Sequence, residues 1–106
     1  MLIDTTTIRN IAFVIALNVN PEKFSLFGSY ATGQANEDSD IDLLVVKNTL
    51  EPKHKRSIEI QKLLIGSKLT VDILVYTNDE LEKEKSLTNS LVNSAIHGAQ
   101  LLFERK

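Results

Sequence analysis

The amino-acid sequence predicts a mixed α/β (α+β) domain, in which a mixed sheet of about four strands is flanked by helices. Two kinds of segment alternate along its 106 residues. In one kind, apolar residues recur every three or four positions, as in helices, and the other consists of short runs rich in Val, Ile and Leu, as in strands. The predicted order is α-β-β-α-β-α-β, with no repeat and no linker. We therefore expect one domain over residues 1–106.

The first half of the chain carries one helix and two strands. Residues 5–18 have apolar side chains at spacings of three and four, which predicts a helix that residues 18–21 bring to an end. A short apolar run at 24–27 predicts the first strand, and the small polar residues 30–39 predict a loop with room for one helical turn. Residues 41–46 predict the second strand. Its apolar residues fall on both faces, so we expect it to be central in the sheet.

The second half continues the alternation. Pro52 suits the first turn of a helix, Gly66 suits the end of that helix, and the apolar residues 69–76 predict the third strand. Because one helix joins the second and third strands, they should form a right-handed parallel unit. The remaining elements are a charged helix over 78–85, a helix from Ser86 to Gly98, and a last strand or helical extension over 100–103. We expect these residues of the second and third strands to be buried: Ile41, Leu43, Leu44, Val45, Val71, Ile73 and Leu74.

The composition excludes several classes of protein. There is no cysteine, which rules out a disulfide scaffold, a cysteine-ligated metal site and a cysteine nucleophile. The chain has 12 basic and 14 acidic residues and a formal charge of −2, unlike a protein that coats nucleic acid. It lacks an 18-residue apolar run and a signal-peptide pattern at its start. We therefore expect no membrane span and a cytoplasmic location.

Two aspartates open the second predicted strand. Asp40 and Asp42 are two positions apart, so their side chains point to the same face of a strand. Carboxylates that close repel each other unless a cation lies between them, and Mg²⁺ typically takes one or two carboxylates together with substrate phosphates. The pattern indicates a metal site, although an isolated pair of this kind is more often a polar boundary between loop and strand.

A third aspartate and a Gly-Ser pair are further candidates for the same site. Asp72 lies in an apolar strand that should be largely buried, where a carboxylate needs a metal, a basic partner or the sheet edge. If the second and third strands are parallel, Asp72 lies near Asp40 and Asp42. Gly28 and Ser29 close the first strand, and a glycine lets the backbone approach a ligand such as a phosphate closely.

These residues together resemble a known family. The segment Gly28-Ser29, ten further residues and Asp40-Ile41-Asp42 are similar to the signature of the DNA polymerase β nucleotidyltransferase superfamily. The short chain points to its minimal nucleotidyltransferase (MNT) branch. Asp72 matches the family's third aspartate, and residues 97–104 (His-Gly-Ala-Gln-Leu-Leu-Phe-Glu) are similar to the family's closing motif. The resemblance covers essentially the whole chain and implies the nucleotidyltransferase fold.

The resemblance implies a two-metal mechanism. In the family, the residues that match Asp40, Asp42 and Asp72 are catalytic and hold two Mg²⁺ ions, and those that match Gly28 and Ser29 bind the nucleotide. ATP then transfers its nucleotidyl group to an acceptor hydroxyl. Many relatives carry arginine at the positions of Tyr30 and Thr32. Lys47 or the basic run at 53–56 could take over the missing charge, although we interpret that run as a solvated helix face.

The resemblance also implies a partner. The core uses up these 106 residues, so we expect the acceptor to be presented in trans. MNT proteins pair with HEPN-domain toxins and attach AMP to a tyrosine of the toxin, and this antitoxin activity is the function that we predict. One alternative is a nucleotidyltransferase for a small-molecule acceptor. The other is a non-catalytic antitoxin that neutralises its partner by binding. No membrane or stable nucleic-acid partner is expected, whereas a homo- or hetero-oligomer is compatible with the sequence.

Overall fold

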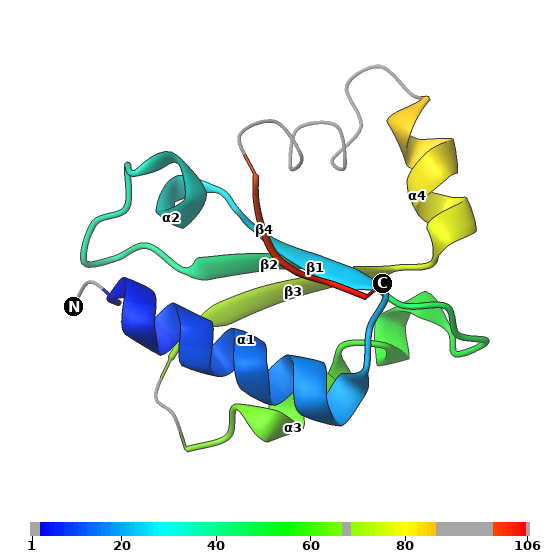
Figure 1. The fold of residues 1–106 in the computed structure, drawn as a ribbon, viewed down its shortest axis with the longest axis horizontal. Coiled ribbons are helices and arrows are strands. Elements are labelled where there is room, and N and C mark those ends of the chain that lie inside the picture. The colour runs from blue at the N-terminus through cyan, green and yellow to red at the C-terminus, as the bar shows by residue number, and fades with distance from the viewer. Residues whose placement is uncertain (1–2, 67–68, 87–98, 106) are drawn as a thin grey trace.

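A computed structural model describes residues 3–66, 69–86 and 99–105 of the chain. Four strands form one mixed sheet in the order β3-β2-β1-β4 (Figure 1). Strands β2 and β3 are parallel, whereas β1 is antiparallel to both β2 and β4. The parallel pair and the central position of β2 confirm two predictions from the sequence. The strands are β1 Lys23–Phe27, β2 Ile41–Val46, β3 Val71–Tyr76 and β4 Gln100–Glu104.

Helices lie on both faces of this sheet. In Figure 1, α1 and α3 cover the lower face, α4 stands above the sheet, and α2 lies at the end of β1. The bounds are α1 Thr5–Val19, α2 Ser29–Thr32, α3 Ile58–Leu63 and α4 Asn78–Lys85, with a 3-10 turn, η1, at Lys53–Lys55. The helix that the sequence predicts from Ser86 to Gly98 falls on residues 87–98, outside the described residues.

The core has two parts, one on each face of the sheet. The α1 face is lined by the predicted stripe of α1, by Ile60 of α3 and by alternate residues of the strands, including Phe24, Leu43 and Val75. The opposite face carries a smaller cluster of Leu44, Val46, Tyr76 and Leu81. Strand β2 thus contributes apolar residues to both faces, because it is central.

Strand β3 lies at an edge of the sheet, and this corrects part of the predicted core. Ile73 and Leu74 are only half-buried, because no strand covers the outer side of β3. The other five predicted core residues are buried, from Val45, which is fully inaccessible, to Val71.

The predicted helix after Pro52 is also different, since it is divided into η1 and α3. The break coincides with Arg56, whose guanidinium turns inward and forms a two-point ion pair with Glu80 at the start of α4. Arg56 Nε also donates to the carbonyl oxygen of Glu51 at 2.9 Å. Glu80 caps α4 together with Thr77 in a capping box. The ion pair between Arg56 and Glu80 thus links α4 to the segment that precedes α3, whereas the sequence suggested only solvated charges.

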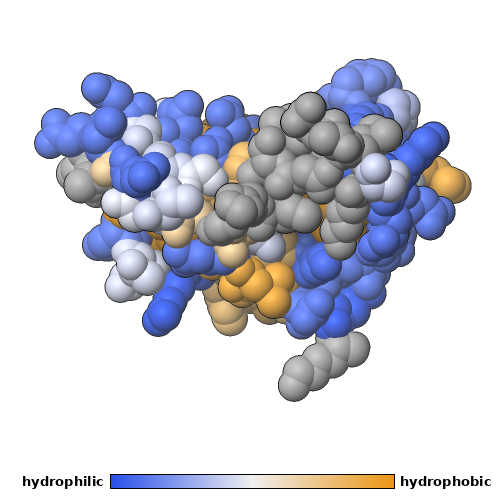
Figure 2. All heavy atoms as spheres, turned by 90° about the horizontal axis from the view of Figure 1, so that it is seen from above, coloured by the Kyte–Doolittle hydropathy of each residue, from blue (hydrophilic) through white to orange (hydrophobic). Residues whose placement is uncertain are grey.

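The surface of the described residues is mostly hydrophilic when it is seen from above, and apolar side chains gather in the lower middle of that view (Figure 2). None of the described helices is long and apolar enough to cross a membrane. Among the described residues, the large apolar side chains that remain exposed are Phe13, Val14, Leu17, Leu50, Ile58, Ile65 and Leu101.

Candidate active site

The fold brings the predicted acidic residues together where β2 and β3 begin. Asp42 and Asp72 are direct neighbours in the parallel register of these strands. Asp40 immediately precedes β2, and the Ile41 amide donates to the carbonyl oxygen of Thr70 at 3.0 Å, which aligns the two strand starts. Alternation along β2 places Asp40 and Asp42 on the face of Leu44, opposite the face that α1 covers.

Asp42 is the centre of this acidic group. Its pKa is raised, first because it is partly buried, then by the negative charges of Asp72 and Asp40, and finally by a hydrogen bond with Asp72. Each of these effects disfavours a second negative charge at this place. The arrangement therefore favours either a shared proton or a bound cation.

Gly28 packs directly against this group, and no other residue fits there. A Cβ atom built on Gly28 would lie 2.3 Å from Oδ2 of Asp42, far inside van der Waals contact. The backbone of Gly28 has φ 73° and ψ −155°, a region that essentially only glycine occupies. The sequence predicted that Gly28 permits a close approach. The structure shows that the nearest partner is an aspartate of the site itself.

Ser29 begins the short helix α2 beside Asp42. The amides of Ala31 and Thr32 both donate to the carbonyl oxygen of Gly28, at 3.1 and 3.2 Å. The first amides of such a turn lack acceptors within it, and they are the groups that bind phosphate at helix starts. Gln100 of β4 fixes this turn from below, because its Nε2 donates to the carbonyl oxygen of Ala31 at 2.6 Å. Sequence reasoning missed this contact, and no local pattern signals it.

A tight turn delivers Asp40 to the site. Asn36 and Ser39 close it, with the Asn36 amide donating to Oγ of Ser39 at 2.9 Å. The Asp38 amide donates to Oδ1 of Asn36 at 2.8 Å. The polar residues that predicted a loop thus satisfy the loop's own backbone.

Two sequence interpretations of the site need correction. The strand around Asp72 was expected to be largely buried, but β3 is an edge strand and Asp72 is exposed, in one of the three settings that the sequence allowed for it. Lys47 lies at the far end of β2, and the basic run follows it along the chain. At about 3.3 Å per residue, Lys47 is about 17 Å along the strand from Asp42. It pairs instead with Glu59 at 3.6 Å, and Arg56 pairs with Glu80. Neither supplies charge to the aspartates.

Tyr30 also points away from the acidic group. Its hydroxyl accepts a hydrogen bond from the Ile3 amide at 3.1 Å, and its ring packs against the core on the α1 side. Tyr30 thus has a packing role on the α1 side and is not available to the acidic group. Thr32 is exposed, and its hydroxyl lies 3.4 Å from the carbonyl oxygens of Gly28 and Ser29. The side chains at these two positions therefore supply no positive charge to the site.

The donor set fits a hard divalent cation. Carboxylate oxygens are the ligands that Mg²⁺ prefers, and a cation between Asp42 and Asp72 would relieve the repulsion that raises the Asp42 pKa. In the part of the chain that the structure describes, no group of three or more acidic or histidine side chains is arranged to hold a metal ion, the three aspartates of the site included. A bound ion would therefore complete its shell with water or with phosphate oxygens of a nucleotide.

Comparisons with known proteins identify the class. The sequence profile of the nucleotidyltransferase domain family matches residues 11–97, and the chain belongs to this family. The matched segment includes Gly28, Ser29 and all three aspartates. A search of the curated proteins finds no match.

Solved structures share the fold. A candidate nucleotidyltransferase from Sulfolobus solfataricus has a TM-score of 0.62 and 23% identity, over 92% of this chain and 78% of that one. A toxin–antitoxin crystallised with AMP-PNP has a TM-score of 0.65 and 24% identity, over 92% and 74%. A variant of toxin–antitoxin MntA-HpeT, with two aspartates replaced by glutamate, has a TM-score of 0.62 and 22% identity, over 92% and 72%.

Proposed function

We propose that this nucleotidyltransferase is a cytoplasmic antitoxin that transfers AMP from ATP to the hydroxyl group of a tyrosine in a HEPN-type toxin. The observation that carries the proposal is the contact of three segments at one point. Asp42 lies directly opposite Asp72 on the neighbouring strand and abuts the backbone of Gly28. Acidic ligands and a phosphate-binding turn are thereby held side by side, as nucleotidyl transfer requires.

The residues have distinct roles in this proposal. Asp40, Asp42 and Asp72 hold Mg²⁺, in two positions as the family resemblance implies. Mg²⁺ supplies charge neutralisation and lowers the pKa of the acceptor hydroxyl. The start of α2 at Ser29 binds phosphate oxygens, and the rigid Gly28 turn keeps them beside Asp42. The hydroxyl oxygen forms a bond to the α-phosphorus, the bond to pyrophosphate breaks, and the hydroxyl proton is released.

Charge balance supports the need for metal. ATP carries about four negative charges and the aspartates add up to three, so about two dications are needed to assemble them. Among the described residues, neither Lys47 nor Arg56 reaches the site, since both are paired at the other end of the sheet. Nucleotide binding should therefore depend strongly on Mg²⁺.

The structural neighbours support a toxin as partner. Two of them are toxin–antitoxin structures, and one contains AMP-PNP. The two aspartates replaced in MntA-HpeT are two positions apart, the same spacing as Asp40 and Asp42. Within the 106 residues, the nucleotidyltransferase fold accounts for the described elements, which is consistent with an acceptor supplied in trans.

The test is a transfer reaction in vitro. The purified chain is incubated with the product of its neighbouring gene, Mg²⁺ and ATP labelled at the α-phosphate. Label should appear on the partner, and Asp42→Asn should reduce the rate a hundred- to thousandfold or more, about 1.4 kcal/mol for each factor of ten. Partner binding should survive, since it uses a wider surface. Absence of transfer by the wild type would refute the proposal.

A non-catalytic antitoxin is the second candidate, and one observation favours it. The positions of Tyr30 and Thr32 carry no cation, which weakens the grip on a triphosphate. This candidate predicts that Asp42→Asn protects cells from the toxin as well as the wild type does. Lasting protection that is lost with Asp42→Asn would decide for catalysis.

A further inference from the structure

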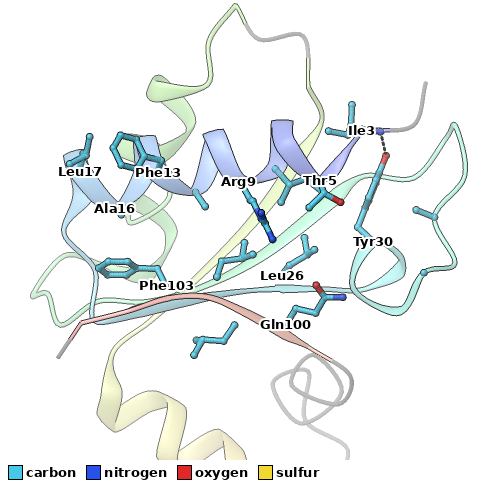
Figure 3. Close-up of a pocket in the computed structure, with 16 residues that line it drawn as sticks. Ile3, Thr5, Arg9, Phe13, Ala16, Leu17, Leu26, Tyr30, Gln100 and Phe103 are labelled. Carbon is cyan, nitrogen blue, oxygen red and sulfur yellow. Dashed lines mark hydrogen bonds between the residues drawn. The ribbon is translucent and has the colours of Figure 1, made fainter.

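A second concave site lies on the face of the sheet opposite the aspartates. It has a volume of about 900 Å³ and is walled by α1, α2 and β4 (Figure 3). Leu26 and Phe103 form part of its floor, and both belong to the core cluster on the α1 side. Nothing in the transfer reaction uses this groove, whose size is within the range of ligand sites, about 300–1,000 Å³.

The charge of this groove is unusual. Of its sixteen lining residues, Arg9 is the only one with a charged side chain. Figure 3 shows Arg9 extending from α1 into the groove, toward Leu26 and Gln100. No acidic side chain of the described residues pairs with it. A guanidinium over an apolar floor gains most from a carboxylate that a ligand brings with it.

The apolar surface continues beyond the groove along α1. Arg9, Phe13 and Leu17 are four positions apart and form one row, about 12 Å long at 1.5 Å per residue. Phe13 is 65% exposed and Leu17 is 68% exposed. Leu101, at 56% exposure, stands on the β4 side. A small ligand in the groove would leave this rim in water, whereas a helix laid along α1 would cover it.

We propose that the groove between α1 and β4 docks an amphipathic helix of a partner protein, with an acidic side chain opposite Arg9. The inference rests on the proposed function in one respect, namely that this partner is the protein that presents the acceptor hydroxyl. Apolar residues at spacings of three and four on the partner helix would pack against Phe13 and Leu17. Arg9 is exposed in the free chain, and the docked helix would cover the ion pair between Arg9 and this carboxylate.

The groove also touches the turn that carries Ser29. Tyr30 and Gly33 of this turn line the groove. Gln100, which also lines the groove, donates a hydrogen bond to the carbonyl oxygen of Ala31 in the turn. A partner docked there would lie against the back of α2, whose front faces the aspartates. Docking would thereby place the partner next to the nucleotide without covering the acidic residues.

The test uses a phage library of random 18-residue peptides, selected on the immobilised full chain without nucleotide or metal. Enriched peptides should carry apolar residues at helical spacing and at least one acid. Their synthetic forms should lose tenfold or more in affinity against Arg9→Glu and against Leu17→Ser. Leu50→Ser is the matched control, because Leu50 is fully exposed outside the groove. Replacing the peptide's acid by lysine should restore binding to Arg9→Glu.

Several outcomes would overturn this inference. They are no enrichment, equal binding to Arg9→Glu or Leu17→Ser, or failure of the charge exchange to restore affinity. Displacement of the peptides by dodecanoate in an Arg9-dependent manner would assign the groove to a small anionic amphiphile. A dimer that Leu17→Ser dissociates would assign it to a second copy. Peptide binding should persist in Asp42→Asn, so failure of AMP transfer and failure of docking are separate results.

Discussion

The contact between Gly28 and Asp42 makes a sharp prediction for Gly28→Ala. The new methyl group would lie 2.3 Å from Oδ2 of Asp42, whereas ordinary contacts begin near 3.4 Å. The carboxylate must therefore move by roughly 1 Å, and a misplacement of about that size costs about a hundredfold in rate. The backbone at φ 73° and ψ −155° adds strain of about 1–3 kcal/mol for any residue with a side chain.

Gly33→Ala provides the matched control. Gly33 also has a positive φ, 79°, but nothing lies within 4 Å of a Cβ atom built there. It should lose about 1 kcal/mol of stability from the left-handed backbone alone and keep its transfer rate. Urea unfolding and the labelled-ATP assay measure both variants. If Gly28→Ala transferred AMP at the rate of Gly33→Ala, the position of the Asp42 carboxylate would not matter to the chemistry.

Four other substitutions test packing and charge. Leu43→Ala should cost about 2–5 kcal/mol in urea unfolding, and Leu74→Ala on the edge strand clearly less; equal losses would contradict the sheet order. The ion pair with Arg56 lowers the pKa of Glu80 from 4.5 to about 2, so its stabilisation is present above pH 4.5 and lost as pH falls toward 2. Wild type should exceed Glu80→Gln in stability at pH 7 and converge with it near pH 2; equal stability at pH 7 would count against the pair. The raised pKa of Asp42 means that its ionisation destabilises the metal-free fold as pH rises, so Asp42→Asn in EDTA at pH 8 should be at least as stable as wild type; a less stable variant would show that the carboxylate serves the fold.

Local patterns predicted most of the elements because each pattern has a local cause. Strand β2 and helix α4 begin and end at the predicted residues, and α1 extends one residue beyond its predicted end. Parallel pairing of β2 and β3 followed from the single helix expected between them. That pairing brings Asp42 opposite Asp72, and so the meeting of the aspartates was predictable from the sequence.

The remaining features depend on which segments become neighbours in space. Nothing local places β3 at an edge, so the strand around Asp72 was expected to be largely buried, whereas Asp72 is exposed at the sheet edge. In the sequence, Arg56 is one of several charges in a basic run. Its partner Glu80 is 24 positions away and becomes its neighbour only when α4 packs in place. The hydrogen bond from Gln100 to the carbonyl oxygen of Ala31 joins residues 69 positions apart. Contacts of this kind are set by the packing of whole elements.

The short helix α2 is the element that links the two proposed sites. Its first residue follows Gly28, which abuts Asp42, and its next residue, Tyr30, lines the groove on the opposite side of the sheet. Gly28 at the acidic site and Tyr30 in the apolar groove are thus only two positions apart in the chain. The turn is constrained from both sides, because a side chain at Gly28 would collide with Asp42 and Gln100 donates to the carbonyl oxygen of Ala31 from the groove side. A partner that binds the groove would therefore contact α2 without touching the aspartates.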